Sequence, residues 1–354
     1  MALNINEARK LVLDLGRPNL RLYWADFLLS YAIGVATLIL AYPHPLGSLS
    51  FWVFAVPSML AWYRALSFIH ELAHFRKQLG SFRIGWNALA GMPMAFPAFM
   101  YVKSHTIHHN PKTYGTAADG EYLPFHTLPR WQLVGYLLSS FWTAPILIVR
   151  FAILYPLSLF IAPLRKFLVE RGSSVVITFN HIGEWPGPQE QREWRVMETA
   201  VCVFWLVVGG LGLAGIIPAR VFGVTYIVVT GALMFNAMRT LAAHRFANDG
   251  RVLSIEEQLL DSVNLVNGFP GWVFSALGAP VGLRFHALHH LFPFLPYHSL
   301  GEAHRRLAGK LSAESSYHKV SEPGIFQACL KIWRRDPVPT ASPALTPETL
   351  IPAP

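Results

Sequence analysis

Three short histidine clusters, far apart in the sequence, place the strongest constraint on how this chain can fold. The last cluster reads HALHH at residues 286–290, and its imidazoles at i, i+3 and i+4 lie on one face of a helical turn, where they can point at a common centre. Segment 105–109 repeats this spacing, and segment 70–74 carries two more imidazoles one turn apart. The clustered residues are His70, His74, His105, His108, His109, His286, His289 and His290. A shared metal site would require the fold to bring three distant segments together.

Long apolar runs identify the chain as an integral membrane protein. Hydrophobic residues make up 53% of the sequence and charged residues only 14%, with a mean hydropathy of +0.36, which is too apolar for an ordinary soluble domain. Four runs are near the length needed to cross a bilayer as a helix, at residues 25–42, 51–69, 196–217 and 221–243. We therefore predict an all-α membrane fold with four transmembrane helices in two hairpins, interfacial helices, and a helical cap that holds the histidine clusters.

Segment 131–162 is apolar enough for a further crossing, but it contains Arg150 and the prolines Pro145 and Pro156. A single crossing there would put the first two histidine clusters and the third on opposite sides of the membrane, which a shared metal site forbids. We therefore predict an interfacial or re-entrant segment with no net crossing.

The distribution of Lys and Arg predicts the orientation of the hairpins. The chain has a formal net charge of +9, yet residues 43–50 contain no Lys or Arg and residues 218–220 contain one. Nearly all the other basic residues lie on the histidine side, so the positive-inside rule makes the clusters and both termini cytoplasmic. The membrane would be the inner membrane of a bacterium or the endoplasmic reticulum of a eukaryote. The positive charge favours anionic lipid or an acidic protein as a partner, and we expect no nucleic acid, since no such motif is present.

We predict a single membrane domain over residues 1–336, whose cytoplasmic cap comprises residues 70–195 and 244–336. Within the cap, the polar stretch 165–195 is expected to form a loop over the site. The stretch 337–354 is rich in Pro, Ala and Thr and is expected to be a disordered tail.

Eight grouped histidines are too many for one metal ion. A catalytic zinc site typically uses three protein ligands and a water, so two metal ions are implied. Imidazole suits iron, copper, zinc and nickel, and ligand type alone does not choose among them. The Glu and Glu-x-x-His motifs of a ferritin-type di-iron bundle are absent as a set.

The three clusters resemble those of the membrane fatty acid desaturase and hydroxylase superfamily, whose signature is HxxxH followed by two HxxHH motifs at the cytoplasmic ends of membrane hairpins. The match in order, spacing and placement covers roughly Trp24 to Leu307. The third cluster continues as HHLFP with Pro296 close behind, which is similar to acyl-lipid desaturases, many of which carry Gln where this chain has His286.

The resemblance implies a site of two iron ions that uses O2 to oxidise an unactivated C–H pair in a fatty acyl lipid or acyl thioester. Formation of a double bond is the expected outcome, with hydroxylation as the alternative, and cluster spacing does not decide between them. Acyl-CoA desaturases carry a ninth histidine in an NxxAH pattern, which implies that His244 is a ligand, although Thr240 stands at the Asn position. The sequence has no HPGG motif and no cysteine cluster, so a separate electron donor of ferredoxin or cytochrome b5 type is expected.

Metal-bound imidazoles need partners that orient the rings through their second N–H group. The candidates for this role are Asp119, Glu121, Asp249 and Asp261, together with Thr240. We assign no separate catalytic acid or base.

Two other classes of protein remain as alternatives. Segment 70–74 is also a literal HExxH, in which Glu71 would be the general base of a membrane zinc protease and Asp249 a distal acid. That reading leaves six clustered histidines unexplained. A histidine-rich metal transporter should hold its ligands within the spans rather than at their ends.

Overall fold

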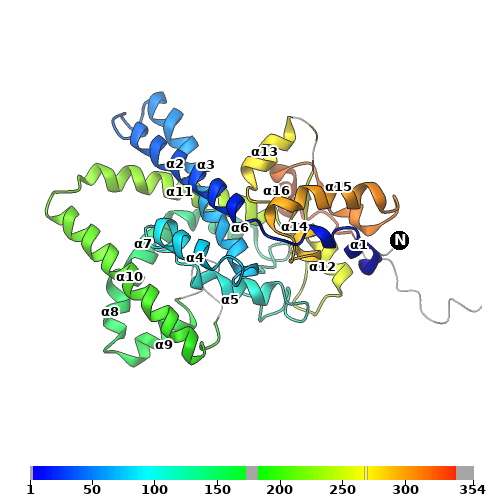
Figure 1. Cartoon of the computed structure of the whole chain (residues 1–354), viewed down its shortest axis with the longest axis horizontal. Helices are drawn as coiled ribbons and strands as arrows, with labels where there is room; N and C mark the ends of the chain where they lie inside the picture. Colours follow the sequence, from blue (N-terminus) through cyan, green and yellow to red (C-terminus); the bar gives the residue numbers. More distant parts are fainter. Residues whose placement is uncertain (1–2, 173–181, 267, 269, 340–354) are drawn as a thin grey trace, which may run out of the picture.

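The computed structural model describes residues 3–172, 182–266, 268 and 270–339. Regular structure in this part of the chain is helical, apart from a parallel pairing of two short strands, β1 (Asn264–Leu265) and β2 (Ser321–Glu322). Figure 1 shows the long helices on the left, the short helices of the two chain ends on the right, and the histidine-bearing helix α14 (His286–Leu291) among the latter. The predicted all-α membrane fold is confirmed at this level.

The first predicted hairpin forms as a packed pair of helices, α2 (Leu20–Ala41) and α3 (Leu49–His74). Asn19 and Ser48 begin these helices, each with a side-chain oxygen that accepts a backbone N–H of the first turn. Gly34 allows the two helices to approach closely, because a Cβ there would lie 3.0 Å from the Trp62 ring. Helix α3 continues to His74, which places the first histidine cluster in its last two turns.

The second predicted hairpin does not form a packed pair. Helices α10 (Pro188–Leu213) and α11 (Ala219–Leu241) are joined by a short turn but diverge from it in Figure 1. Helix α11 packs against α3 and α7 (Ser140–Val149), whereas α10 packs against the π-helical segment Arg150–Leu154 that follows α7. The two helices follow one another as predicted, but the segment around Arg150, rather than α11, packs against α10.

Five described helices are long and apolar enough to cross a membrane. Four of them, α2, α3, α10 and α11, cover the predicted spans apart from one to four residues at the C-terminal ends of α2, α10 and α11. The fifth is Ser140–Ser158, which combines α7, the π-helical segment and α8 (Tyr155–Ser158) and is the segment for which we predict no net crossing.

An ionic cluster explains how this fifth apolar helix accommodates an arginine. The Arg150 guanidinium is 2% exposed and lies 3.0 Å from Glu198 of α10, whose second carboxylate oxygen lies 2.7 Å from Arg165. Charged groups within apolar segments are tolerated where they pair with one another. The cluster therefore fixes the fifth helix against α10.

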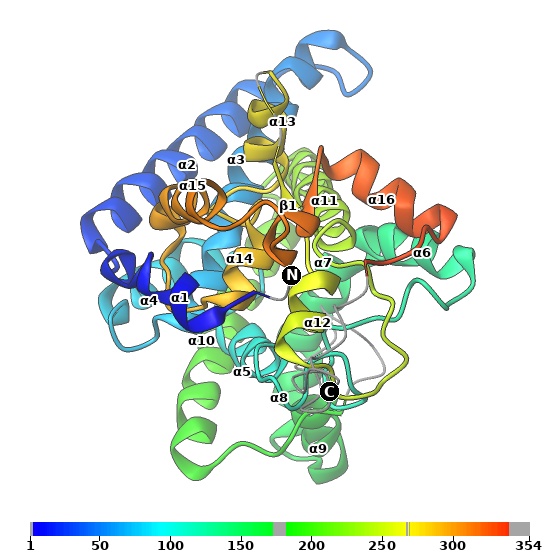
Figure 2. The same cartoon turned by 90° about the vertical axis from the view of Figure 1, so that its right-hand side faces the viewer.

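The remaining helices build the cap and its connections. Their bounds are α1 Ile5–Lys10, α4 Gly80–Trp86, α5 Phe99–His108, α6 Arg130–Leu138, α9 Ala162–Glu170, α12 Ile255–Asp261, α13 Gly271–Gly278, α15 Leu300–Lys310 and α16 Ile325–Arg334. A π-helical segment, Asn87–Gly91, and three short 3₁₀ segments, Leu13–Leu15, Tyr297–Ser299 and Ser316–Val320, complete the set. Figure 2 faces this end of the molecule and shows α1 and α16 on either side of α14. Residues Ala8 and Val12 of the N-terminal segment belong to the same apolar core as Leu288 of α14, so the chain start packs against the third histidine cluster.

The predicted loop 165–195 is partly helical. Its start lies in α9, and α10 begins at Pro188 rather than Val196. A proline in the first turn is well suited to the start of a helix. The residues before Val196 are mostly polar, so hydropathy alone did not assign them to the helix. Residues 173–181 of this loop lie outside the described part of the chain, as do residues 340–354 of the predicted disordered tail.

Candidate metal centre

The nine predicted ligands reach one region from four separate segments. His70 and His74 lie in the last turns of α3, the second cluster closes α5, and the third forms α14. His244 follows the end of α11 and is held by a β-bridge to Ser262. Because α3 and α11 are neighbours, their ends bring the first cluster and His244 together.

The histidines form two groups, and within each group one ring nitrogen per residue lies within 4.8 Å of the others. The first group is His70, His74, His105, His109 and His289. The second group is His108, His244, His286 and His290. Sequence neighbours are thus divided between the groups, since His108 belongs to one and His109 to the other.

The ring nitrogens suit a pair of cations. Nε2 of His74 lies 3.0 Å from Nε2 of both His105 and His289, and Nε2 of His244 lies 2.9 Å from that of His286. Imidazole nitrogens that face one another in this way leave lone pairs directed at a shared centre. Both buried ring nitrogens of His70 have no hydrogen-bond partner in the described part of the chain. The donor set, all imidazole, therefore fits two transition-metal ions, one in each group.

The electrostatics of the site favour the neutral rings that metals require. Burial lowers the pKa well below its usual value for His105, His109, His244, His286, His289 and His290. His108 differs, because burial lowers its pKa but the carboxylates of Asp119, Glu121 and Asp261 together outweigh this effect and raise it. Neutral imidazole is the form that coordinates a metal ion.

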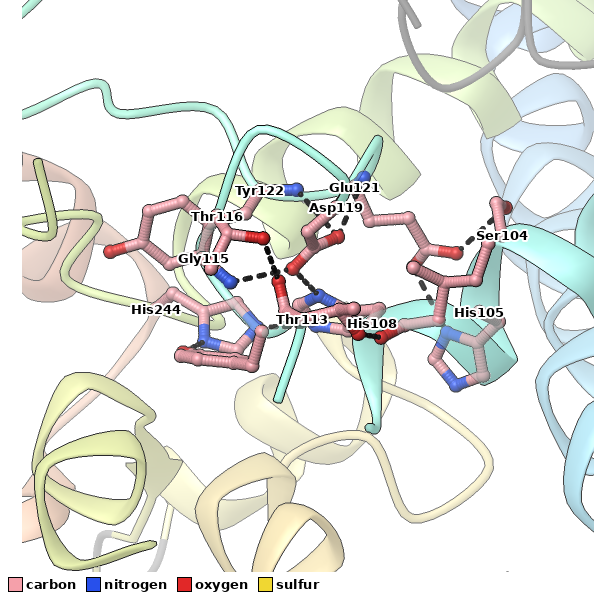
Figure 3. Close-up of polar contacts among 12 residues, drawn as sticks. Ser104, His105, His108, Thr113, Gly115, Thr116, Asp119, Glu121, Tyr122 and His244 are labelled. Atoms are coloured by element: carbon pink, nitrogen blue, oxygen red, sulfur yellow. Dashed lines mark hydrogen bonds and ion pairs between the residues drawn. The ribbon is translucent and has the colours of Figure 1, made fainter. Parts of the chain in front are cut away.

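Asp119 orients His108 (Figure 3). Its Oδ2 atom lies 2.8 Å from Nδ1 of His108, and the carboxylate also accepts the backbone N–H groups of Gly115, Glu121 and Tyr122. Burial works to raise the pKa of Asp119, but His108 and these donors lower it below its usual value. The carboxylate is therefore ionised and fixes the ring so that Nε2 faces the second group.

Glu121 does the same for His105 (Figure 3). Its Oε2 atom lies 2.9 Å from Nδ1 of His105, and its Oε1 atom accepts the Ser104 hydroxyl at 3.0 Å. Burial raises the pKa of Glu121 to about 7.

Asp261 acts through a tyrosine that the sequence analysis missed. The Tyr114 hydroxyl donates to Asp261 Oδ2 at 2.7 Å and lies 2.8 Å from Nδ1 of His244, so the tyrosine links the carboxylate to the ring. Burial raises the pKa of Asp261. Tyr114 has no spacing signal in the sequence, since it is 130 residues from His244.

The other two candidates for orienting a ring are placed differently. The Thr240 hydroxyl donates to the backbone oxygen of Asn236 at 2.9 Å and lines the cavity beside the histidines. Asp249 is exposed, and no hydrogen bond or ion pair joins it to a histidine in the described residues.

Glu71 is not placed as the base of a zinc protease. Its side chain is fully buried and accepts the Tyr23 hydroxyl and the backbone N–H of Tyr297, with the other oxygen 3.7 Å from Nδ1 of His70. The carboxylate is thus held by Tyr23 and Tyr297 and lies next to the His70 ring without a hydrogen bond to it. The only sequence signal that Glu71 lies near the His70 ring was that it directly follows His70 in the HELAH segment.

A cavity of about 120 Å³ reaches both groups of histidines. It extends between α3 and α11, where Leu66, Phe96 and Leu233 form apolar walls, and it ends at His70, His105, His108, His244 and His286. The cavity therefore places apolar walls next to the metal centre.

Comparisons with known proteins agree with this geometry. Residues 47–321 match the family model described as fatty acid desaturase. The chain is 42% identical over 331 residues to a ceramide hydroxylase from Caulobacter vibrioides (strain NA1000 / CB15N), and the match covers 93% of each chain. No solved structure matches the chain.

Proposed function

The chain belongs to the fatty acid desaturase family, and from this premise we propose that it is a di-iron hydroxylase of ceramide or a closely related long-chain amide lipid. One observation carries the proposal: a chain that gathers nine histidines in two groups is similar to a ceramide hydroxylase along 93% of its length. The membrane context and the oxidoreductase class follow from the family.

The similarity to a hydroxylase reverses the order of the two outcomes expected from the sequence. Formation of a double bond was favoured on the HHLFP motif, which is a local pattern and does not report the fate of the carbon after the first hydrogen leaves. Identity of 42% over 331 residues weighs more than one motif, so insertion of oxygen becomes the main proposal and desaturation the alternative.

The two groups of histidines would hold the iron ions. Bound there, they would supply the activation of O2 and the removal of hydrogen from an alkyl C–H bond, with two electrons from a separate ferredoxin or cytochrome b5 type donor. In hydroxylation, one oxygen atom enters the C–H bond and the other leaves as water.

The protein's own residues would orient and shield this chemistry. Asp119, Glu121 and the Tyr114–Asp261 pair hold three rings by their Nδ1 atoms, so that the Nε2 atoms keep one direction. The apolar walls of the cavity, from α3 and α11, would align a lipid chain and exclude water.

For the topology we propose four crossings, with Ser140–Ser158 returning to the side from which it enters. His105 and His244 lie at the same metal centre, so the chain between them must cross the membrane an even number of times. Helices α10 and α11 already supply two crossings, which leaves none for Ser140–Ser158. The histidine centre would then face the cytoplasm by the positive-inside rule.

The test is expression in a host supplied with a ceramide and labelled O2, followed by mass spectrometry of the lipids. A gain of one labelled oxygen atom, absent in His289→Ala, is the expected result. Loss of two hydrogen atoms instead would identify a desaturase. Peptide cleavage that depends on Glu71, with zinc in the purified protein, would reject both.

A further inference from the structure

One face of α11 is polar where the helix meets the cavity. Asn236, Arg239 and Thr240 stand at i, i+3 and i+4, and all three line the cavity that ends at the histidines. The rest of the cavity wall from α11, Ala232 and Leu233, is apolar. A cation therefore lies on the wall of a cavity between membrane helices.

Arg239 is only partly satisfied by the fold. Its Nη2 atom donates to Oδ1 of Asn236 at 2.9 Å, and the guanidinium also contacts the Tyr63 hydroxyl. Its buried Nε atom has no hydrogen-bond partner, and no carboxylate within the described ranges forms an ion pair with it. An arginine near the end of a membrane helix commonly extends its side chain to the interface, whereas Arg239 lines the cavity between helices. Because Asn236 fixes the group without neutralising it, donors remain available to a bound molecule.

Arg239 lies close to the metal centre. It lies in the last turn of α11, and His244 follows the end of that helix by three residues. The same cavity is lined by Arg239, His244 and His286. A group bound by the guanidinium would therefore share this cavity with the histidines of the metal centre.

The surroundings define the chemistry of that group. A guanidinium only donates, so its ligand must offer an acceptor oxygen. Both oxygens of Glu121, which lines the same cavity, already bond Ser104 and His105. With a pKa of about 7 this group is partly ionised near neutral pH, and its negative charge disfavours an anionic head group. A neutral carbonyl or hydroxyl oxygen attached to an apolar chain fits the cavity best.

We propose that Arg239, held by Asn236, binds the amide carbonyl oxygen of the lipid substrate and so selects a carbon close to the head group for oxidation. This inference rests on the proposed function for the identity of the substrate as an amide lipid. Arg239 is then a substrate-positioning residue, and the apolar wall deeper between α3 and α11 takes the chain beyond the oxidised carbon.

The experiment compares wild type, Arg239→Gln and Arg239→Lys in lipid nanodiscs. The matched control is Arg220→Gln, which removes the same charge from the other end of α11, where the side chain contacts Tyr42 and His44. Three quantities are measured: iron content, binding of the short-chain ceramide N-octanoyl sphinganine to metal-free protein, and the position of the new hydroxyl group. Dioctanoyl phosphatidylglycerol serves as the anionic probe.

We expect Arg239→Gln to keep its iron and its thermal stability but to bind the ceramide about tenfold or more weakly, the loss of one charged hydrogen bond. Its product should carry the hydroxyl group on more than one carbon. Arg239→Lys should recover part of the affinity, and Arg220→Gln should match wild type.

Three results would overturn the inference: unchanged binding and a single product position in Arg239→Gln, loss of iron in that variant, or dependence on Arg239 for phosphatidylglycerol but not ceramide. The proposed function fails separately. If the wild type binds ceramide but does not hydroxylate it, the binding measurement still tests Arg239.

Discussion

Asp119 lies 2.8 Å from Nδ1 of His108, and both side chains are buried. Three backbone N–H groups hold the same carboxylate, so the ring is fixed from the side opposite the second group of histidines. A carboxylate placed in this way raises the basicity of a metal ligand and restrains its rotation.

Asp119→Asn should weaken metal binding and activity by about 10–100-fold, because an amide is a poorer acceptor for the His108 N–H and carries no charge. Metal content after dialysis and lipid turnover measure the effect. The matched control is Asp249→Asn, which changes an exposed carboxylate and should leave both quantities unchanged. Equal losses in the two variants would show that the contact with His108 is not the cause.

His108→Ala and His289→Ala each remove one ring from a different group. Each variant should lose the ion of its own group and nearly all activity while it keeps its helical content, which circular dichroism and metal analysis would show. His44→Ala is the control, since His44 stacks on Phe54 at the turn between α2 and α3. Full metal content in His289→Ala would contradict the division into two groups.

The metal-free protein should lose stability as the pH falls through about 6.5. Six buried histidines of the site have pKa values lowered well below that of the unfolded chain, so the unfolded state binds more protons there. Each contributes up to about 1.4 kcal/mol per pH unit. His108, Glu121 and Asp261 have raised pKa values and oppose this trend, but they are fewer.

Denaturant unfolding of metal-free protein at several pH values from about 7.5 to about 5 measures the slope. Metal-loaded protein is the reference, because bound ions compete with protons for the same nitrogens. A metal-free protein that becomes more stable as the pH falls would contradict the prediction.

Cysteine labelling tests the topology in a background that lacks Cys202 and Cys329. Gly47, Gly135, Gly187 and Gly309 are suited to it because a Cβ at each would meet no atom within 4 Å. An impermeant maleimide should label Gly47→Cys in intact cells and Gly309→Cys only after lysis. Gly135→Cys and Gly187→Cys flank the fifth apolar helix and should both behave like Gly309→Cys. Opposite behaviour of this pair would show that Ser140–Ser158 crosses the membrane.

The sequence alone was enough to locate the membrane helices and the histidines. Apolar runs of span length and imidazoles at i, i+3 and i+4 are local patterns, and a local pattern fixes which residues share a helix face. This is why the predicted spans coincide with α2, α3, α10 and α11 to within a few residues and why the histidines of each cluster point to one side of their helix.

Only the tertiary structure decided how the histidines divide and what holds them. Helix periodicity gives the direction of a side chain but not the position of one helix relative to another, so it could not assign His108 and His109 to different groups. The link from Asp261 through Tyr114 to His244 joins residues up to 147 positions apart. The exposure of Asp249 and the divergence of α10 from α11 depend likewise on packing between distant segments, which no local pattern encodes.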